Sequence, residues 1–177
     1  PEILIRYFSY FTIDTNIIVA ICCSILLVNP TSALGRFFSR PQTQTAICIY
    51  ILVVGIVYNL ILRFLWAPEG LQKAVDELLH SVIPVLFLLY WFLFVPKNSL
   101  QWRQVFPWLI YPFAYTVLVL IRGSFSGFYP YPFIDVNQLG LNKALLNAGG
   151  LTLVFLVISL LFIAIAKGMS TGKRVTA

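Results

Sequence analysis

The residues best suited to chemistry in this 177-residue chain are a run of polar side chains near its start and a single histidine. Ser9, Thr12 and Asn16 recur at i, i+3 and i+7 with Thr15 beside them, so they share one stripe of a helix. A threonine hydroxyl is a poor nucleophile unless a base removes its proton, and a neutral imidazole is the commonest such base. The residue types therefore suggest acyl-transfer chemistry, with Thr12 attacking a carbonyl and His80 acting first as base and then as acid.

Such a pair needs two kinds of supporting group. An acid that orients the second imidazole nitrogen would complete the logic of a catalytic triad. Asp135, in a loop, is one candidate for this acid, and Asp76 and Glu77, at i−4 and i−3 from His80, are local alternatives. The developing negative charge on an ester oxygen would need hydrogen-bond donors. The candidate donors are Asn16, Tyr115 and Arg63.

Pro84 follows His80 by four residues. Because proline lacks an N–H and its ring crowds the carbonyl four residues before it, the His80 carbonyl loses its helical donor. We therefore expect the helix to bend beside its only imidazole.

Several other chemistries are excluded by counting residues. A tetrahedral zinc site needs three or four ligands, whereas the chain has one histidine, and its three cysteines lie in apolar stretches. No phosphate-binding loop, haem-attachment motif, dinucleotide fingerprint or G-x-S-x-G elbow is present. We therefore expect neither a metal nor a cofactor.

The composition identifies the surroundings of these residues as lipid. Apolar residues make up 60% of the chain, charged residues only 10%, and the mean hydropathy is +0.90. Soluble domains have roughly 45–50% apolar and about 25% charged residues. The chain is therefore expected to be an integral membrane protein. Its net charge of +6 then reflects loops held against an anionic leaflet, and nucleic acid is not expected as a partner.

A helix needs about 20 mostly apolar residues to cross the hydrocarbon core of a bilayer. Five stretches satisfy this, and the alternating pattern of an outer-membrane barrel is absent. We predict an all-α bundle of five transmembrane helices that forms a single domain over residues 1–177, with a non-helical aromatic loop at Gly123–Gly140. The predicted spans are Ile5–Val28, Thr45–Trp66, a third that begins near Leu71 or Asp76 and ends at Val95, Gln104–Ile121, and Asn142–Ala166.

The charges predict an orientation, because Lys and Arg are retained on the cytoplasmic side. One face carries seven basic residues and no acid: Arg36, Arg40, Lys97, Arg103, Lys167, Lys173 and Arg174. The other face carries all six acids and five basic residues. We expect the C-terminus to be cytoplasmic and the Thr12–His80 site to lie toward the outer face. No signal peptide is recognisable, and because the chain opens almost inside a span, we expect a further helix upstream.

The polar residues also allow two readings without catalysis. Ser, Thr and Asn commonly hydrogen-bond between membrane helices, so the stripe on the first span is compatible with a packing subunit of a larger complex. Asp14, Arg63 and His80 are compatible with a polar pathway through a transporter-like bundle.

Three short runs resemble, in order, signatures of the androgen-induced membrane hydrolases, and the resemblance covers most of the chain. Members of that family cleave fatty acid esters of hydroxy fatty acids inside the membrane, using a threonine and a histidine. The runs are Phe11-Thr12-Ile13-Asp14, His80-Ser81-Val82-Ile83-Pro84 and Tyr131-Pro132-Phe133-Ile134-Asp135.

The chain looks most similar to bacterial relatives of that family, which show the run Phe-Ser-Tyr-Phe-Thr-x-x-Thr-Asn found here at Phe8–Asn16. The resemblance implies a cofactor-independent lipid-ester hydrolase or acyl transferase of the bacterial inner membrane, acting on a fatty-acyl ester. His80 is the implied base, and either Thr12 or Thr15 is the implied nucleophile. The family has six spans, which agrees with a helix preceding Ile5. Shared motifs do not fix a substrate.

Overall fold

The computed structural model describes residues 2–65 and 67–172, and within them it contains helices and turns but no strand. Trp66, the predicted end of the second span, and the basic residues Lys173 and Arg174 lie outside the described residues. The helices are α1 (Glu2–Tyr7), α2 (Phe11–Val28), α3 (Ala33–Phe38), α4 (Pro41–Leu60), α5 (Gly70–Glu77), α6 (Ile83–Phe94), α7 (Val105–Ser126), α8 (Val136–Leu139) and α9 (Leu141–Gly172). A π-helical turn, Leu78–Val82, joins α5 to α6, and 3-10 turns occur at Leu62–Phe64, Trp102–Gln104 and Pro132–Ile134.

Five helical segments in the described part of the chain are long and apolar enough to cross a membrane. This confirms the predicted all-α bundle, and the molecule is a multi-pass integral membrane protein. The segments are Phe11–Val28, Pro41–Phe64, Gly70–Phe94, Trp102–Ser126 and Leu141–Ser170.

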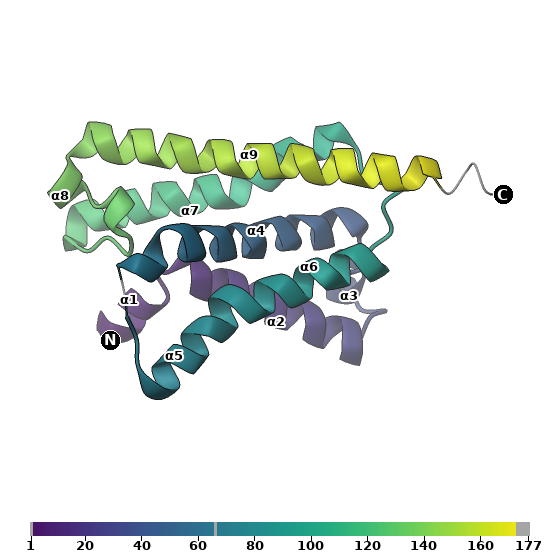
Figure 1. Cartoon of the computed structure of the whole chain (residues 1–177), viewed down its shortest axis with the longest axis horizontal. Helices are drawn as coiled ribbons and strands as arrows, with labels where there is room; N and C mark the ends of the chain where they lie inside the picture. Colours follow the sequence, from purple (N-terminus) through teal and green to yellow (C-terminus); the bar gives the residue numbers. More distant parts are fainter. Residues whose placement is uncertain (1, 66, 173–177) are drawn as a thin grey trace.

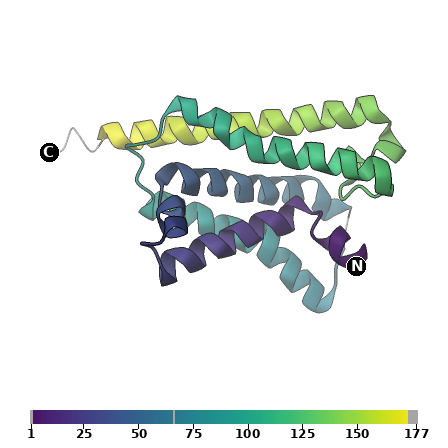
Figure 2. The same cartoon turned by 180° about the vertical axis from the view of Figure 1, so that it is seen from behind.

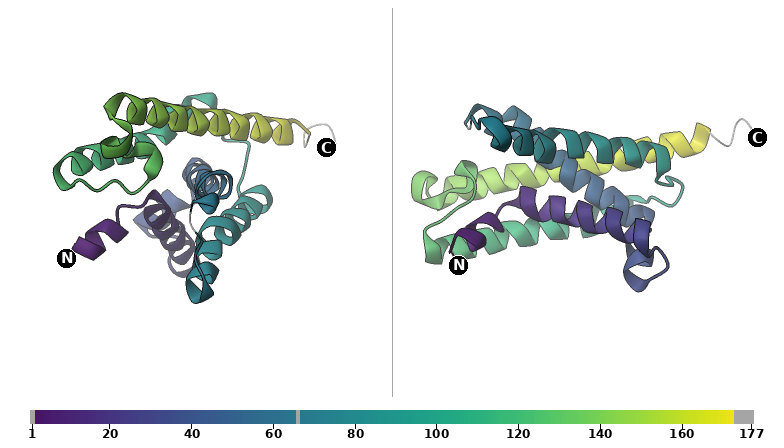
Figure 3. Two further views of the ribbon diagram at one scale, coloured as in Figure 1. Left: turned by 60° about the vertical axis from the view of Figure 1, so that its left-hand side comes forward. Right: turned by 90° about the horizontal axis from the view of Figure 1, so that it is seen from below.

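The second span, built on α4, is the centre of the bundle. It packs against α2, α6 and α9, and α9 packs in turn against α7. In the most apolar part of this span 61% of residues are buried, against 17–28% in the other four. Figures 1 and 2 show α9 and α7 along one side of α4 and α2 and α6 along the other, and the left view of Figure 3 shows α4 between them.

The first span begins later than predicted. It starts at Phe11, not Ile5, because the helix is interrupted at Ser9–Tyr10. Residues Glu2–Tyr7 form the separate helix α1. No side chain caps α2 locally at Tyr10. Its first amides donate instead to phenol oxygens from distant parts of the chain: Phe11 N to Tyr115 Oη at 3.1 Å and Thr12 N to Tyr131 Oη at 3.3 Å. The start of the helix is thus set by tertiary contacts, which hydropathy does not reveal.

The aromatic loop is shorter than predicted. Helix α7 continues to Ser126 and ends at Gly127, whose φ of 69° is a left-handed conformation that favours glycine. Gly123 is needed inside that last part of α7, because a Cβ there would overlap the ring of Tyr129. The loop then folds back through the 3-10 turn Pro132–Ile134 and the short helix α8, which brings Tyr131 under the start of α2.

Candidate active site

Thr12 and His80 line the same cavity, which has a volume of about 600 Å³. The cavity lies at the end of the bundle that carries α1, α5 and α8 (Figure 1). Tyr7 and Leu65, which are 51% and 64% exposed, also line it, so it reaches the surface of the molecule. Its size falls within the range of about 300–1,000 Å³ typical of small-molecule sites.

His80 is held by the acid one helical turn before it. Its Nδ1 lies 2.9 Å from the Asp76 carbonyl oxygen and 3.1 Å from Asp76 Oδ1. Both partners are acceptors, so Nδ1 carries the proton and donates it. In the neutral ring Nε2 then holds the lone pair, which is the arrangement a general base requires. The acid on His80 is therefore Asp76, one of the two local candidates.

Tyr58 of α4 completes this arrangement from across the helix interface. Its ring stacks on the His80 ring with centroids 4.1 Å apart and an angle of 16° between the planes. Its hydroxyl donates a short hydrogen bond to Asp76 Oδ2. Because Tyr58 is only 4% exposed, it holds both the imidazole and its carboxylate against the rigid centre of the bundle.

The π turn Leu78–Val82 sets the direction in which His80 projects. Ile83 N donates to the Leu78 carbonyl, five residues back, so the Leu79 carbonyl loses its usual donor. The His80 carbonyl loses its donor to Pro84, as the sequence predicts. Two asparagines replace these donors: Asn16 Nδ2 lies 3.3 Å from the Leu79 oxygen and Asn59 Nδ2 3.4 Å from the His80 oxygen. Thus α2 and α4 fix the distorted turn from both sides.

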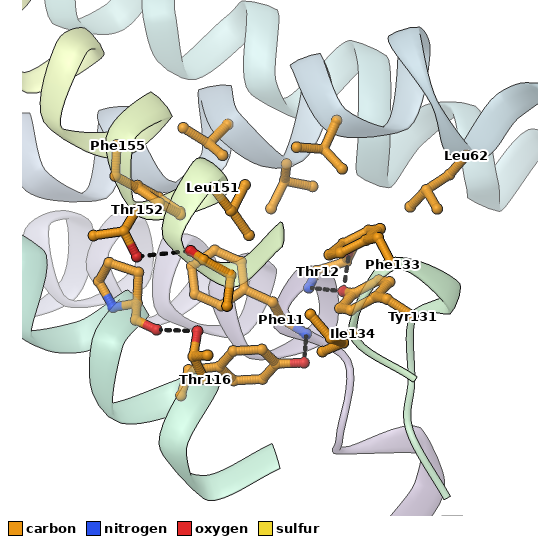
Figure 4. Close-up of a pocket in the computed structure, with 16 residues that line it drawn as sticks. Phe11, Thr12, Leu62, Thr116, Tyr131, Phe133, Ile134, Leu151, Thr152 and Phe155 are labelled. Carbon is orange, nitrogen blue, oxygen red and sulfur yellow. Dashed lines mark hydrogen bonds between the residues drawn. The ribbon is translucent and has the colours of Figure 1, made fainter. Parts of the chain in front are cut away.

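Thr12 is the second residue of α2, and it meets Tyr131 rather than His80. The Thr12 and Tyr131 hydroxyl oxygens are 3.5 Å apart, and Tyr131 also accepts from Thr12 N (Figure 4). No hydrogen bond joins Thr12 to His80 across the cavity. Hydrogen bonds between catalytic groups are often long before substrate binds. Burial raises the pKa of the Tyr131 phenol, so this group stays protonated and able to donate.

The other predicted nucleophile, Thr15, lies elsewhere. It is fully buried and its Oγ1 is 3.4 Å from the Tyr111 hydroxyl, on the side of α2 that faces α7. It lines neither the cavity described above nor the smaller one beside Thr12. Of the two threonines, the structure brings only Thr12 into the cavity that holds His80.

The three predicted oxyanion donors are all occupied by other partners. Asn16 uses its amide on the Thr12 and Leu79 carbonyls, and its Oδ1 is the one buried side-chain oxygen or nitrogen without a partner in the described residues. Tyr115 donates to the Ser9 carbonyl at 2.6 Å. Arg63 pairs with Glu77 at 2.5 Å and lies over the Tyr58 ring at 5.3 Å. Asn16 and Arg63 therefore brace the site, whereas Tyr115 caps α2.

Asp135 is occupied by partners other than His80. Its carboxylate accepts from Asn137 N at 2.9 Å and Gln138 N at 3.4 Å, which caps helix α8. It lines neither of the two cavities that contain Thr12. Its position after Tyr131-Pro132-Phe133 is explained by the need to end the 3-10 turn and start α8.

Tyr58 and Tyr131 were missed as site residues by reasoning from sequence. Tyr131 belongs to one of the three motifs that carry the resemblance, so the motif pointed to this residue. The motif did not indicate its role. Tyr58 precedes Asn59 in an apolar span, and nothing in its surroundings distinguishes it from an interfacial anchor.

The site offers little to a metal ion. Within residues 2–65 and 67–172, no three His, Cys, Asp or Glu side chains are grouped as metal ligands. Asp76 Oδ1 and His80 Nδ1 already bind each other.

Comparisons of this chain with protein-family models, with curated proteins and with solved structures found no match.

Proposed function

We propose that this protein is an intramembrane lipid-ester hydrolase or acyl transferase in which Thr12 is the nucleophile and His80 the general base. The observation that carries the proposal is the shared cavity: the buried hydroxyl of Thr12 and a histidine oriented by Asp76 both line it. The resemblance of the motifs at Thr12, His80 and Tyr131 to the androgen-induced membrane hydrolases agrees with these roles.

In the proposed reaction, Thr12 Oγ1 attacks the ester carbonyl carbon while its proton passes to His80 Nε2. The bond between the carbonyl carbon and the alcohol oxygen then breaks, and His80 returns the proton to that oxygen. A water molecule, or a second alcohol, attacks the acyl-Thr12 ester in the same way and restores the free hydroxyl. Asp76 stabilises the imidazolium that forms twice in this cycle.

Tyr131 is assigned the role of donor to the carbonyl oxygen. Its neutral phenol lies beside Thr12 Oγ1, where negative charge develops on a carbonyl under attack. The proton transfer from Thr12 needs an approach to about 3 Å, or one bridging water.

The substrate is proposed to be amphipathic and to enter from the membrane. Most of the cavity wall is apolar or aromatic, with a few polar groups, among them Thr12, His80, Asp76 and Gln72. This suits a molecule with a buried ester inside a mostly hydrocarbon body. From the charge distribution along the chain, we propose that this end faces the outer side of the membrane.

A transporter-like pathway is the weaker alternative. The second large cavity, at the other end of the bundle, is lined by Lys97, Lys167 and Leu100 among others and shares no residue with the first. Cys48, Trp91 and Ile163, at 0% exposed, fill the helix interfaces away from the Thr12 cavity. This packing separates the two cavities, and it does not favour a continuous wet path.

The test is an esterase assay on purified protein in lipid nanodiscs. We expect Thr12→Ala and His80→Ala each to lower kcat/KM by roughly 10³-fold or more. Thr15→Ala is the matched control, because it removes the same hydroxyl from the same helix outside the cavity. Thermal unfolding of each variant checks that it folds. Equal rates in the wild type and both cavity variants would end the proposal.

A further inference from the structure

A second, smaller cavity adjoins the first at Thr12. It has a volume of about 40 Å³ and lies between α2, α4, α7 and α9 (Figure 4). Thr12, Leu62 and Tyr131 line both cavities, so these three side chains form the boundary between them. The proposed nucleophile thus stands between a large space and a small one.

Beyond Thr12 and Tyr131 at its boundary, the small cavity offers mainly hydrocarbon to a ligand. Its other polar side chains are used elsewhere: Thr116 Oγ1 donates to the Pro112 carbonyl and Thr152 Oγ1 to the Ala148 carbonyl, each at 2.9 Å within its own helix. The Tyr115 hydroxyl donates to the Ser9 carbonyl at 2.6 Å. The remaining walls are aliphatic and aromatic, including Leu151 and Phe155. A group that enters this space should therefore be apolar.

The position of His80 decides which part of an ester lies in which cavity. The leaving alcohol must take its proton from His80, and His80 lines only the large cavity. The alcohol part of the ester must therefore lie in the large cavity. The acyl chain is attached to the carbonyl carbon opposite the alcohol oxygen, so it points past Thr12 toward the small cavity.

The size of the small cavity then limits the acyl group. A water-sized group needs roughly 10–15 Å³, so about 40 Å³ holds about three such groups beyond the carbonyl. We infer that the enzyme acts on short acyl groups, of about two to four carbons, esterified to a large amphipathic alcohol. This inference rests on the proposed function, and it places the fatty part of the substrate in the alcohol.

The inference predicts a chain-length profile. With p-nitrophenyl esters that differ only in their acyl chain, we expect kcat/KM of the wild type to be highest from acetyl to butyryl. By octanoyl it should fall about tenfold or more, because each methylene that does not fit a packed pocket is costly. Ratios between esters within one sample are independent of the fraction of protein that is folded.

Two variants of α9 test the cause of the profile. Leu151→Ala enlarges the small cavity and should move the optimum to longer chains, whereas Ala148→Leu fills it and should lower the rate with butyryl relative to acetyl. Leu153→Ala and Ala164→Leu make the same changes at exposed positions of the same helix and should leave the profile unchanged.

Three results would overturn the inference. A wild-type profile that is flat, or highest with palmitoyl, contradicts a small acyl site. A profile that neither α9 cavity variant moves contradicts the role of this cavity. If Thr12→Ala and His80→Ala still lower the rate in these cases, only the acyl preference is wrong. If neither does, the proposed function fails and this inference with it.

Discussion

The two ends of helix α4 are built in different ways. At its start, Thr45 Oγ1 accepts from Trp91 Nε1 at 2.9 Å, and Trp91 is fully buried and packs on Phe162 with ring centroids 4.6 Å apart. At its end, Tyr58 and Leu62 face a cavity of about 600 Å³. The region around Trp91 is filled by large side chains. The region around Tyr58 leaves a cavity, and polar groups are held at its wall.

The difference indicates how the molecule combines stability with the proposed reactive site. The Trp91 region holds α4, α6 and α9 together through close packing, the main source of helix association in a membrane. The His80 region depends on hydrogen bonds that cross between helices and hold a distorted turn. We therefore expect substitutions in the first region to change unfolding and substitutions in the second to change catalysis.

The largest effect should come from Asp76→Asn. The amide oxygen still reaches Nδ1, but the negative charge that stabilises the imidazolium is lost and the amide hydrogens compete for the ring nitrogen. We expect kcat/KM to fall by roughly 10³-fold or more, with little change in unfolding temperature. Glu77→Gln, which removes the adjacent charge bound to Arg63, is the control and should stay within about threefold. Equal losses in both would show that general electrostatics, not the orientation of His80, is responsible.

Trp91→Ala should give the next largest effect, and on stability. It removes a fully buried indole and its hydrogen bond to Thr45. We expect unfolding in detergent to become easier by roughly 3 kcal/mol, the low end of the usual range because lipid-like tails already replace water in the reference state. Trp102→Ala, at a 48% exposed position, should change little. Loss of catalysis in the folded Trp91 variant would contradict the separation of the two regions.

Tyr131→Phe tests the donor role directly. The ring and its stacking on Phe133 are kept, and only the hydroxyl beside Thr12 is removed. We expect kcat to fall by roughly 10²-fold with KM nearly unchanged, since the bond is strongest in the transition state. Tyr129→Phe removes a phenol from the same loop and should retain wild-type kcat. A rise in KM without a fall in kcat would instead assign Tyr131 to substrate binding.

Asn59→Ala should have the smallest effect of the four. It leaves the His80 carbonyl without the amide that replaces its helical donor, which should cost about 1–2 kcal/mol of stability. We also expect a loss of activity of about tenfold, because the π turn sets the direction of the imidazole. Asn98→Ala, at an exposed loop position, is the control for both measurements. An unchanged rate in Asn59→Ala would mean that Asn16 and Tyr58 suffice to hold the turn.

Several parts of the site followed from sequence alone. The i, i+4 spacing of Asp76 and His80 places the acid and the imidazole on one helical face, and Pro84 predicts that the His80 carbonyl loses its helical donor. The predicted stripe of Ser9, Thr12 and Asn16, with Thr15 beside it, is buried, although Ser9 lies before the start of α2. These features are local, so the geometry of one helix determines them.

Hydropathy likewise determined the membrane class and the five spans. Each span must form its backbone hydrogen bonds within its own helix and must be long enough to cross the bilayer. The Asp135 cap on α8 is a local contact as well. Only the tertiary structure decided that Thr12, and not Thr15, shares a cavity with His80, and that Tyr58 and Tyr131 line that cavity. Those outcomes depend on the rotation and depth of helices relative to one another. Contacts between different helices and loops fix these quantities, 18 positions apart for Tyr58 and Asp76 and 119 for Thr12 and Tyr131, and no periodicity within a single helix records them.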